Sequence, residues 1–156
     1  MKKKLALIVS TLLLFCFLFS GCGGEDEALS KLMYGLKPSM TMQQVSDYFE
    51  EKGYEVTHGS YTTNLGSFET LQVTDTMLGY IDKYSVQDIV VTFRDGDFFD
   101  FAAIPSSSAT EITDYITSVF GKPDDIGYDI WYYKDYNIYL LNGTDYSFLH
   151  VGVVVE

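Results

Sequence analysis

The sequence predicts an α+β fold built from two tandem repeats, each made of a helix followed by antiparallel strands. The stretch TMQQVSDYF at residues 41–49 recurs as SATEITDYI at residues 108–116. Each copy precedes segments rich in Val, Ile, Phe, Tyr and Thr that are separated by turn residues, which is typical of strands. We expect repeats over about residues 30–105 and 106–156, sharing one core because neither small half buries enough surface alone.

The first 21 residues carry the pattern of a secretory signal peptide. A basic start is followed by an almost wholly apolar run at residues 5–19, and the small residues Ser20 and Gly21 precede Cys22. The apolar run is shorter than the roughly 20 residues that a membrane-spanning helix needs. Small residues directly before a cysteine resemble the lipobox of bacterial lipoproteins, a family in which the cysteine is acylated. The resemblance implies a palmitate-type lipid anchor at Cys22, in which each buried CH₂ contributes about 0.8 kcal/mol.

The segment after this cysteine is acidic and rich in glycine. Residues 22–29 contain GGEDE and are expected to form a flexible linker between the lipid and the body. Without residues 1–21 the chain keeps 7 of its 10 Lys and Arg and all 22 Asp and Glu, so its net charge is 7 − 22 = −15. Such a body is repelled by nucleic acid, which excludes that class of partner. Because Cys16 leaves with the signal peptide, no disulfide is predicted.

A capping box opens both copies of the nine-residue stretch. Thr41 is followed three residues later by Gln44, and Ser108 by Glu111. At this spacing the two side chains satisfy free backbone N–H groups at a helix start. Apolar residues follow at helical spacing, an Asp-Tyr pair recurs in the same register, and a glycine ends each pattern. Because all these features agree, we interpret the two copies as a duplication.

Seven segments are predicted as strands from their composition and the turn residues between them. They lie at residues 54–58, 68–76, 88–94, 97–104, 129–134, 137–142 and 147–155. Asp95-Gly96 is a strong signal for a two-residue hairpin turn.

Two short motifs resemble a superfamily of small exported proteins. Residues 40–45, MTMQQV, are similar to the "MT-x-x-QV" helix start of the beta-lactamase inhibitor proteins and of the BamE-like (SmpA/OmlA) outer-membrane-assembly lipoproteins. Residues 120–123, FGKP, are similar to the "(L/F)G-x-P" that closes the same region in relatives. The resemblance implies a beta-lactamase-inhibitor-like fold of two α/β repeats, whose combined sheet offers an aromatic, concave face to a partner protein. The chain lacks the disulfides of the inhibitor proteins.

Alternation along the strands divides their side chains between a core face and a more polar face. With Asp95-Gly96 as the turn, Phe93 opposes Phe98, Thr92 opposes Phe99 and Val90 opposes Phe101, which puts Phe99 and Phe101 on the polar face. The same reasoning for the later strands leaves further aromatic residues there. A register slip of one residue would exchange the faces. The expected partner-binding surface is Phe99, Phe101, Tyr132, Tyr139, Phe148 and His150.

No catalytic, cofactor or metal site is predicted, because no H-x-x-x-H, G-x-S-x-G or Walker-type pattern accompanies His58 and His150. We interpret the chain as a non-enzymatic, extracytoplasmic lipoprotein that binds a protein partner. We expect it on the outer face of the membrane of a cell with a Gram-positive-type envelope. One alternative is a carbohydrate or cell-wall binder that stacks sugars on Trp131 and Tyr132. Another is a scaffold subunit of an envelope assembly.

Overall fold

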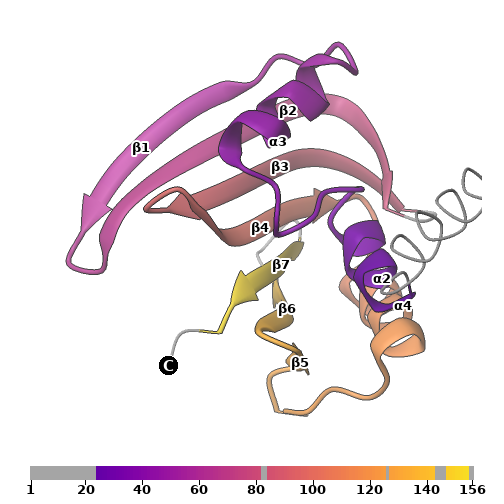
Figure 1. Cartoon of the computed structure of the whole chain (residues 1–156). Helices are drawn as coiled ribbons and strands as arrows, with labels where there is room; N and C mark the ends of the chain where they lie inside the picture. Colours follow the sequence, from indigo (N-terminus) through magenta and orange to yellow (C-terminus); the bar gives the residue numbers. More distant parts are fainter. Residues whose placement is uncertain (1–23, 82–83, 126, 143–146, 155–156) are drawn as a thin grey trace, which may run out of the picture.

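The computed structural model describes residues 24–81, 84–125, 127–142 and 147–154. The mixture of helices with an antiparallel sheet confirms the predicted α+β class. The expected signal peptide and Cys22 lie outside the described residues. In chain order the elements are α2 (Gly24–Leu32), α3 (Met42–Glu50), β1 (Thr57–Thr63), β2 (Gly66–Ile81), β3 (Tyr84–Arg94), β4 (Asp97–Pro105), α4 (Ala109–Phe120), β5 (Trp131–Tyr133), β6 (Tyr136–Asn142) and β7 (Ser147–Val153) (Figure 1).

The described strands form one sheet with the order β1-β2-β3-β4-β7-β6-β5. Strands β1 to β4 form an antiparallel meander, in which each strand pairs with the next, and β5 to β7 form a second meander. The two meanders meet where β4 pairs with β7. Helix α4 follows the first meander and precedes the second (Figure 1).

Strand β1 lies further along the chain than the sequence predicts. We expected a strand at residues 54–58, whereas β1 runs over Thr57–Thr63. All seven of its residues are exposed, so no alternation of apolar and polar side chains marks it. It pairs with β2 along its whole length, and a two-residue turn after Thr63 joins the two strands. The strand is thus set by its neighbour rather than by its own sequence.

Both predicted capping boxes are present. At α3 the backbone N–H of Gln44 donates to Thr41 Oγ1 at 3.3 Å, and the N–H of Thr41 donates to Gln44 Oε1 at 2.9 Å. At α4 the corresponding distances between Ser108 and Glu111 are 3.4 and 3.1 Å. Gly121 ends α4 with a φ of +87°, a conformation that favours glycine.

Helix α2 replaces most of the expected flexible linker. The chain is helical from Gly24, and its second half packs on the sheet, because Leu29, Leu32 and Met33 recur at the spacing of one helix face. These three side chains are at most 3% exposed. The acidic composition that suggested a linker belongs to the first turns, where Glu27 pairs with Lys31 at 2.8 Å. Their pairing holds the pKa of Glu27 below its ordinary value.

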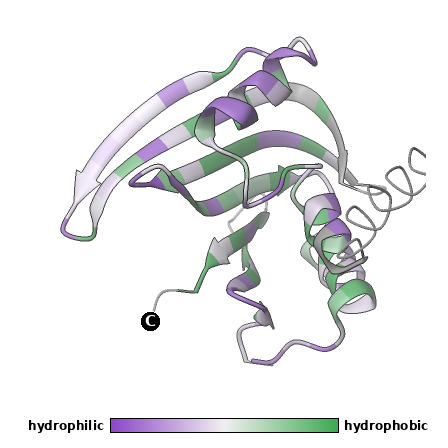
Figure 2. Cartoon of the chain, in the orientation of Figure 1, coloured by the Kyte–Doolittle hydropathy of each residue, from purple (hydrophilic) through white to green (hydrophobic). Residues whose placement is uncertain are grey.

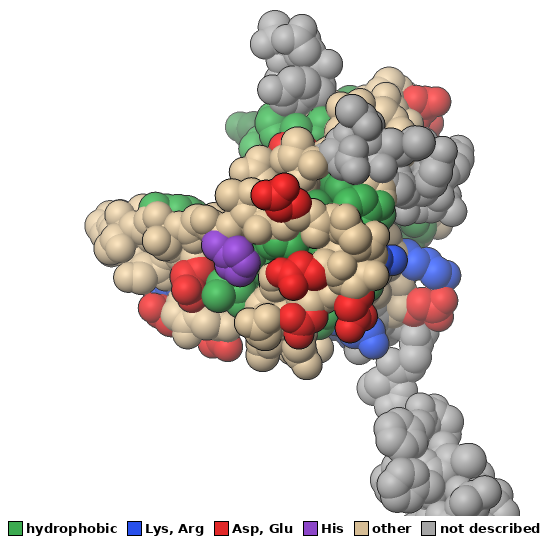
Figure 3. Space-filling view, turned by 90° about the horizontal axis from the view of Figure 1, so that it is seen from above, with side chains coloured by type: hydrophobic (Ala, Val, Ile, Leu, Met, Phe, Trp, Pro, Cys, Tyr) green, Lys and Arg blue, Asp and Glu red, His purple; other side chains and the backbone are tan. Residues whose placement is uncertain are grey.

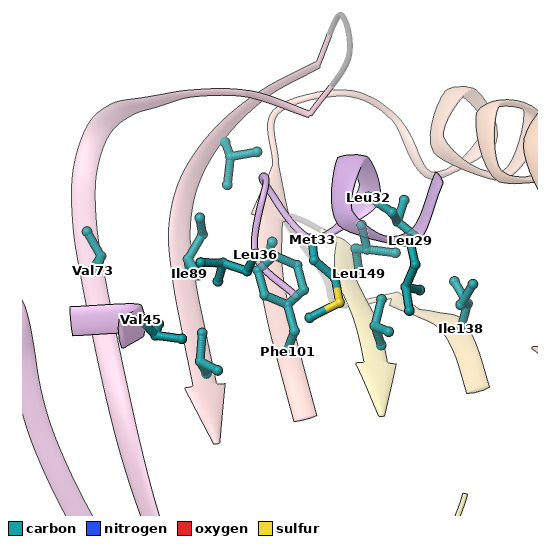
Figure 4. Close-up of a cluster of buried hydrophobic side chains, with 14 of the residues drawn as sticks. Leu29, Leu32, Met33, Leu36, Val45, Val73, Ile89, Phe101, Ile138 and Leu149 are labelled. Atoms are coloured by element: carbon teal, nitrogen blue, oxygen red, sulfur yellow. The ribbon is translucent and has the colours of Figure 1, made fainter. Parts of the chain in front are cut away.

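One face of the sheet and the three helices among the described residues contribute to a single hydrophobic core. In Figure 2, apolar segments recur along β3 and β4, whereas β1 carries few of them. Burying each large apolar side chain contributes roughly 1.5–3 kcal/mol. Figure 4 shows side chains of α2 and of the segment after it turned toward those of the strands, and it labels Leu29, Leu32, Met33, Leu36, Val45, Val73, Ile89, Phe101, Ile138 and Leu149.

Three tyrosines fasten the helices to β2. The hydroxyl groups of Tyr34 and Tyr54 both donate to the carbonyl oxygen of Leu78, where the pairing of β2 with β3 is irregular. The hydroxyl of Tyr48 donates to the carbonyl of Tyr34 at 2.8 Å. Burial raises the pKa of Tyr34 well above its ordinary value, so the phenol stays protonated and keeps donating.

Candidate functional site: the outer face of the sheet

The candidate site is the face of the sheet opposite the helices, which we call the outer face. The three described helices all belong to the core cluster on the other side. One row of paired residues crosses the outer face over five strands: Thr92, Asp100, Gly152, Asn137 and Tyr132. The next row consists of Val90, Ala102, His150 and Tyr139.

Two of the predicted residues, Tyr139 and His150, form the centre of this face. They are direct cross-strand partners, and their rings stack with centroids 4.9 Å apart and an interplanar angle of 4°. Asp100 approaches the other side of the histidine, with its Oδ2 atom 3.3 Å from Nδ1. Burial, together with the negative charge of Asp100, raises the pKa of the Tyr139 phenol. The Tyr139 phenol therefore stays protonated next to His150 and Asp100.

Gly152 lets side-chain oxygens from both neighbouring strands approach its backbone closely beside this cluster. A Cβ atom on Gly152 would lie 3.0 Å from Asn137 Oδ1 and 3.1 Å from Asp100 Oδ1, so the two oxygens flank the position that a side chain would fill. Asn137 Oδ1 is buried and accepts no hydrogen bond. A side chain at position 152 would crowd both oxygens, so glycine is the residue that fits between them.

Phe99 lies at a different part of the outer face from this cluster. Its ring packs edge-to-face on Phe68 at 5.2 Å, and Phe68 stacks on Tyr61 at 5.1 Å with an interplanar angle of 12°. Phe68 is almost fully buried by these neighbours, whereas Tyr61 is half exposed. This aromatic ladder runs from β4 to β1 and ends at the edge of the sheet.

Phe101 does not belong to the outer face, and its prediction as a binding residue is wrong. Phe93 pairs with Phe98 as predicted, but Thr92 pairs with Asp100 rather than with Phe99. Strand β4 therefore has one extra residue between these two pairs, which is a β-bulge. The bulge shifts the register by one, so the later side chains of β4 lie on the face opposite to the one that simple alternation predicts. Phe101 is consequently 0% exposed and sits in the core (Figure 4).

The remaining predicted residues lie on the outer face as expected. Phe148 is half-buried next to His150, with ring centroids 6.3 Å apart. Tyr132 is on β5 at the far edge of the sheet and is 54% exposed. Leu141, which faces Phe148 across the strands and is 51% exposed, was not predicted. Of six predicted residues, the structure thus brings Tyr139, Phe148 and His150 together and separates Phe99 and Tyr132 from them.

Trp131 is unsuited to stack on a sugar, contrary to the carbohydrate alternative. Its side chain is 1% exposed on the core face, and its Nε1–H donates to the carbonyl of Gly121 at 2.9 Å. The bond ties β5 to the end of α4. Of the two rings named for that alternative, Tyr132 is therefore the one that reaches solvent.

Sequence reasoning missed Asp100, Asn137 and Gly152 as parts of the site. Asp100 follows the bulge, which alternation alone does not reveal. Gly152 carried a usable signal, because a glycine inside a strand marks a place where something approaches the backbone closely.

Acidic side chains are more prominent than basic ones on the face of the molecule that Figure 3 shows. In Figure 3, which views the molecule from above, Asp and Glu are spread over the visible surface and Lys and Arg gather at one side. No group of three His, Cys, Asp or Glu that could hold a metal ion occurs among the described residues. In the same part of the chain, no helix is long and apolar enough to cross a membrane.

No protein-family model matches the chain, and comparisons with curated proteins and with solved structures found no match either. The resemblance to the beta-lactamase inhibitor and BamE-like proteins therefore stays a prediction.

Proposed function

We propose that the chain is a non-enzymatic binding module that receives a partner protein on the outer face of its sheet. The observation that carries the proposal is the one-sided arrangement of the helices. All three described helices pack on the core face, while aromatic and aliphatic side chains remain partly exposed on the outer face. Tyr139, His150, Phe148 and Leu141 adjoin one another there, and adjoining exposed apolar side chains mark interaction sites.

The composition of the outer face fits a protein partner. Tyrosine and phenylalanine supply large contact areas at low entropic cost, and interface centres are enriched in them. The stacked Tyr139 and His150 form a rigid platform at the middle of the face. Asp100, whose side chain is 20% exposed, adds a carboxylate beside it, so a lysine or arginine of the partner fits there. The net charge of −15 for residues 22–156 favours the approach of such a basic surface.

We also propose that a lipid on Cys22 tethers the module to the outer side of the cell membrane, in a Gram-positive-type envelope. The signal-peptide and lipobox patterns of residues 1–22 support this placement. Helix α2 begins two residues after the cysteine and packs on the core, so a lipid there would hold the body close to the membrane.

The proposal includes the duplication of one helix-plus-sheet unit and membership in the superfamily of the inhibitor and BamE-like proteins. Capping boxes at both helices support it, as does the antiparallel meander that follows each helix. The last strands of the two halves, β4 and β7, pair with each other, as expected for two copies that share a sheet.

The test is a crosslinking pull-down from native membranes with two matched double variants. Tyr132→Glu with Leu141→Glu changes two exposed outer-face residues, and Val119→Glu with Tyr128→Glu changes two exposed residues of α4 and the following loop. Both variants add the same charge at exposed positions and leave the core intact. We expect one protein to be captured by the parent chain and by the control variant, but not by the outer-face variant. Equal capture by both variants would refute the outer face as the binding surface. If no protein is captured and soluble glycan fragments bind instead, the carbohydrate alternative replaces the proposal.

A further inference from the structure

The edge of the sheet at β1 lacks the features that usually protect an edge strand. Residues 56–68, which contain β1 and its turn, include no Asp, Glu, Lys, Arg or Pro, although 21% of the whole chain is charged. All seven residues of β1 are exposed on both faces. Proteins normally guard such edges with charged side chains, prolines or bulges, because an open edge pairs with other strands. β1 is therefore open to backbone pairing.

The turn before β2 fixes which backbone groups of β1 point outward. A two-residue turn joins Thr63 to Gly66, which face each other as the closing pair. Hydrogen-bonded pairs alternate along an antiparallel ladder, so Thr63, Tyr61 and Gly59 direct their N–H and C=O groups toward β2. The N–H and C=O groups of His58, Ser60 and Thr62 consequently point away from the sheet.

We propose that β1 pairs antiparallel with β1 of a second copy of this chain, around a two-fold axis at Tyr61. In this register Ser60 of each copy faces Thr62 of the other, which gives about four backbone hydrogen bonds between the copies. Tyr61 then faces its own counterpart in a non-hydrogen-bonded pair, in which side chains approach closely. The ladder from Phe99 through Phe68 to Tyr61 would continue into the second copy.

The absence of charge argues for a second copy rather than for a basic segment of another protein. A basic segment would find no carboxylate on β1 to pair with. The β1 strand of a second copy is itself uncharged, so it leaves no charge unpaired at this edge. The nearest acidic residue across the ladder is Glu69, which pairs with Ser60 on β2. At about 4.8 Å between strands, the two copies of Glu69 would lie roughly 14 Å apart, beyond the Debye length of about 8 Å at physiological salt. The repulsion between two acidic bodies is therefore weak at this edge.

Such a dimer goes beyond the proposed function without obstructing it. A two-fold axis perpendicular to the sheet keeps the outer faces of both copies on the same side. His150 on β7 and Tyr139 on β6 lie three and four strands away from β2 in the sheet order, far from the paired edges. The dimer would thus present two binding faces in one direction and increase the avidity for a repeated partner.

The experiment uses disulfide formation in the full chain. Tyr61→Cys would place two thiols opposite each other at a Cα separation of about 4.5 Å, which lies within the range that a disulfide spans. Tyr132→Cys is the matched control, because Tyr132 is exposed to a similar extent (54% against 49%) on the opposite edge. The parent chain, which contains Cys16 and Cys22, gives the background. We expect the Tyr61→Cys chain to form disulfide-linked dimers on mild oxidation well above the control and the parent.

A second measurement removes the pairing without adding a thiol. Ser60→Pro deletes an N–H that points outward, so the ladder with β2 stays intact, and prolines are tolerated in this way on edge strands. Sedimentation should give twice the chain mass for the parent and the single-chain mass for Ser60→Pro, with unchanged circular dichroism. A parent chain that sediments as a monomer, or equal crosslinking at positions 61 and 132, would overturn the proposal. If the parent chain sediments as a dimer but captures no protein in the pull-down, the result counts against the proposed function and leaves the dimer standing.

Discussion

The opposite environments of Phe99 and Phe101 give a quantitative test of the bulge in β4. Phe101→Ala deletes a ring that is 0% exposed in the core, and truncations of this kind cost about 3–5 kcal/mol. Phe99→Ala removes a half-buried ring on the outer face, whose main aromatic contact is Phe68. An aromatic pair is worth about 0.5–1.5 kcal/mol beyond its area, so we expect a total cost of about 1–2 kcal/mol.

Urea unfolding monitored by the fluorescence of Trp131 measures both changes, because this is the single tryptophan of the chain and it is buried. With a slope of about 2 kcal/mol per molar urea, Phe101→Ala lowers the midpoint by roughly 2 M and Phe99→Ala by less than about 1 M. If Phe99→Ala costs as much as Phe101→Ala, or more, then the register of β4 follows simple alternation and the bulge is refuted.

Three further changes test other parts of the account. Tyr34→Phe and Tyr54→Phe should each lower the free energy of unfolding by about 1 kcal/mol, as measured by urea unfolding. The double variant should lose more than the sum of the two, because the Leu78 carbonyl then accepts from neither hydroxyl. Strictly additive losses would count against a shared acceptor. Ser108→Ala should cost about 1 kcal/mol by removing the cap of α4, as measured by thermal unfolding, and no change would argue against the capping box. The pKa of Tyr139 is raised in the folded protein, so the stability that its protonated phenol contributes is complete below about pH 10, where the unfolded phenol titrates, and is lost as the pH rises through the folded pKa. Tyr139→Phe should therefore flatten the fall of the melting temperature at alkaline pH. If the melting temperature of the variant falls as steeply as that of the parent, Tyr139 is not the cause of the fall.

The features of the fold that depend on residues close together in the sequence could be predicted from it. Each capping box needs two side chains at a fixed spacing, so both helix starts were predictable from Thr41, Gln44, Ser108 and Glu111. The faces of β6 and β7 were predictable for the same reason, because side chains alternate along a regular strand.

Other features depend on neighbours that are distant in the sequence. The bulge that turns Phe101 into the core is imposed by pairing with β3, and nothing in residues 97–101 marks it. Strand β1 is polar and exposed, and it becomes a strand through β2. Helix α2 is acidic at its start, so its packing depends on the apolar residues near its end, Leu29 and Leu32. The pairing of β4 with β7, which creates the candidate site, joins residues about 50 positions apart, as in Asp100 and Gly152.

The central claim is that the outer face contacts a partner protein in the native membrane. The most direct measurement places a photoreactive phenylalanine analogue at Tyr132 on the outer face, and at the exposed Tyr128 in the loop before β5 as the control. After irradiation of intact cells, the account predicts one discrete protein adduct from position 132 and none of the same size from position 128. The same adduct from both positions, or none from position 132, would contradict the claim.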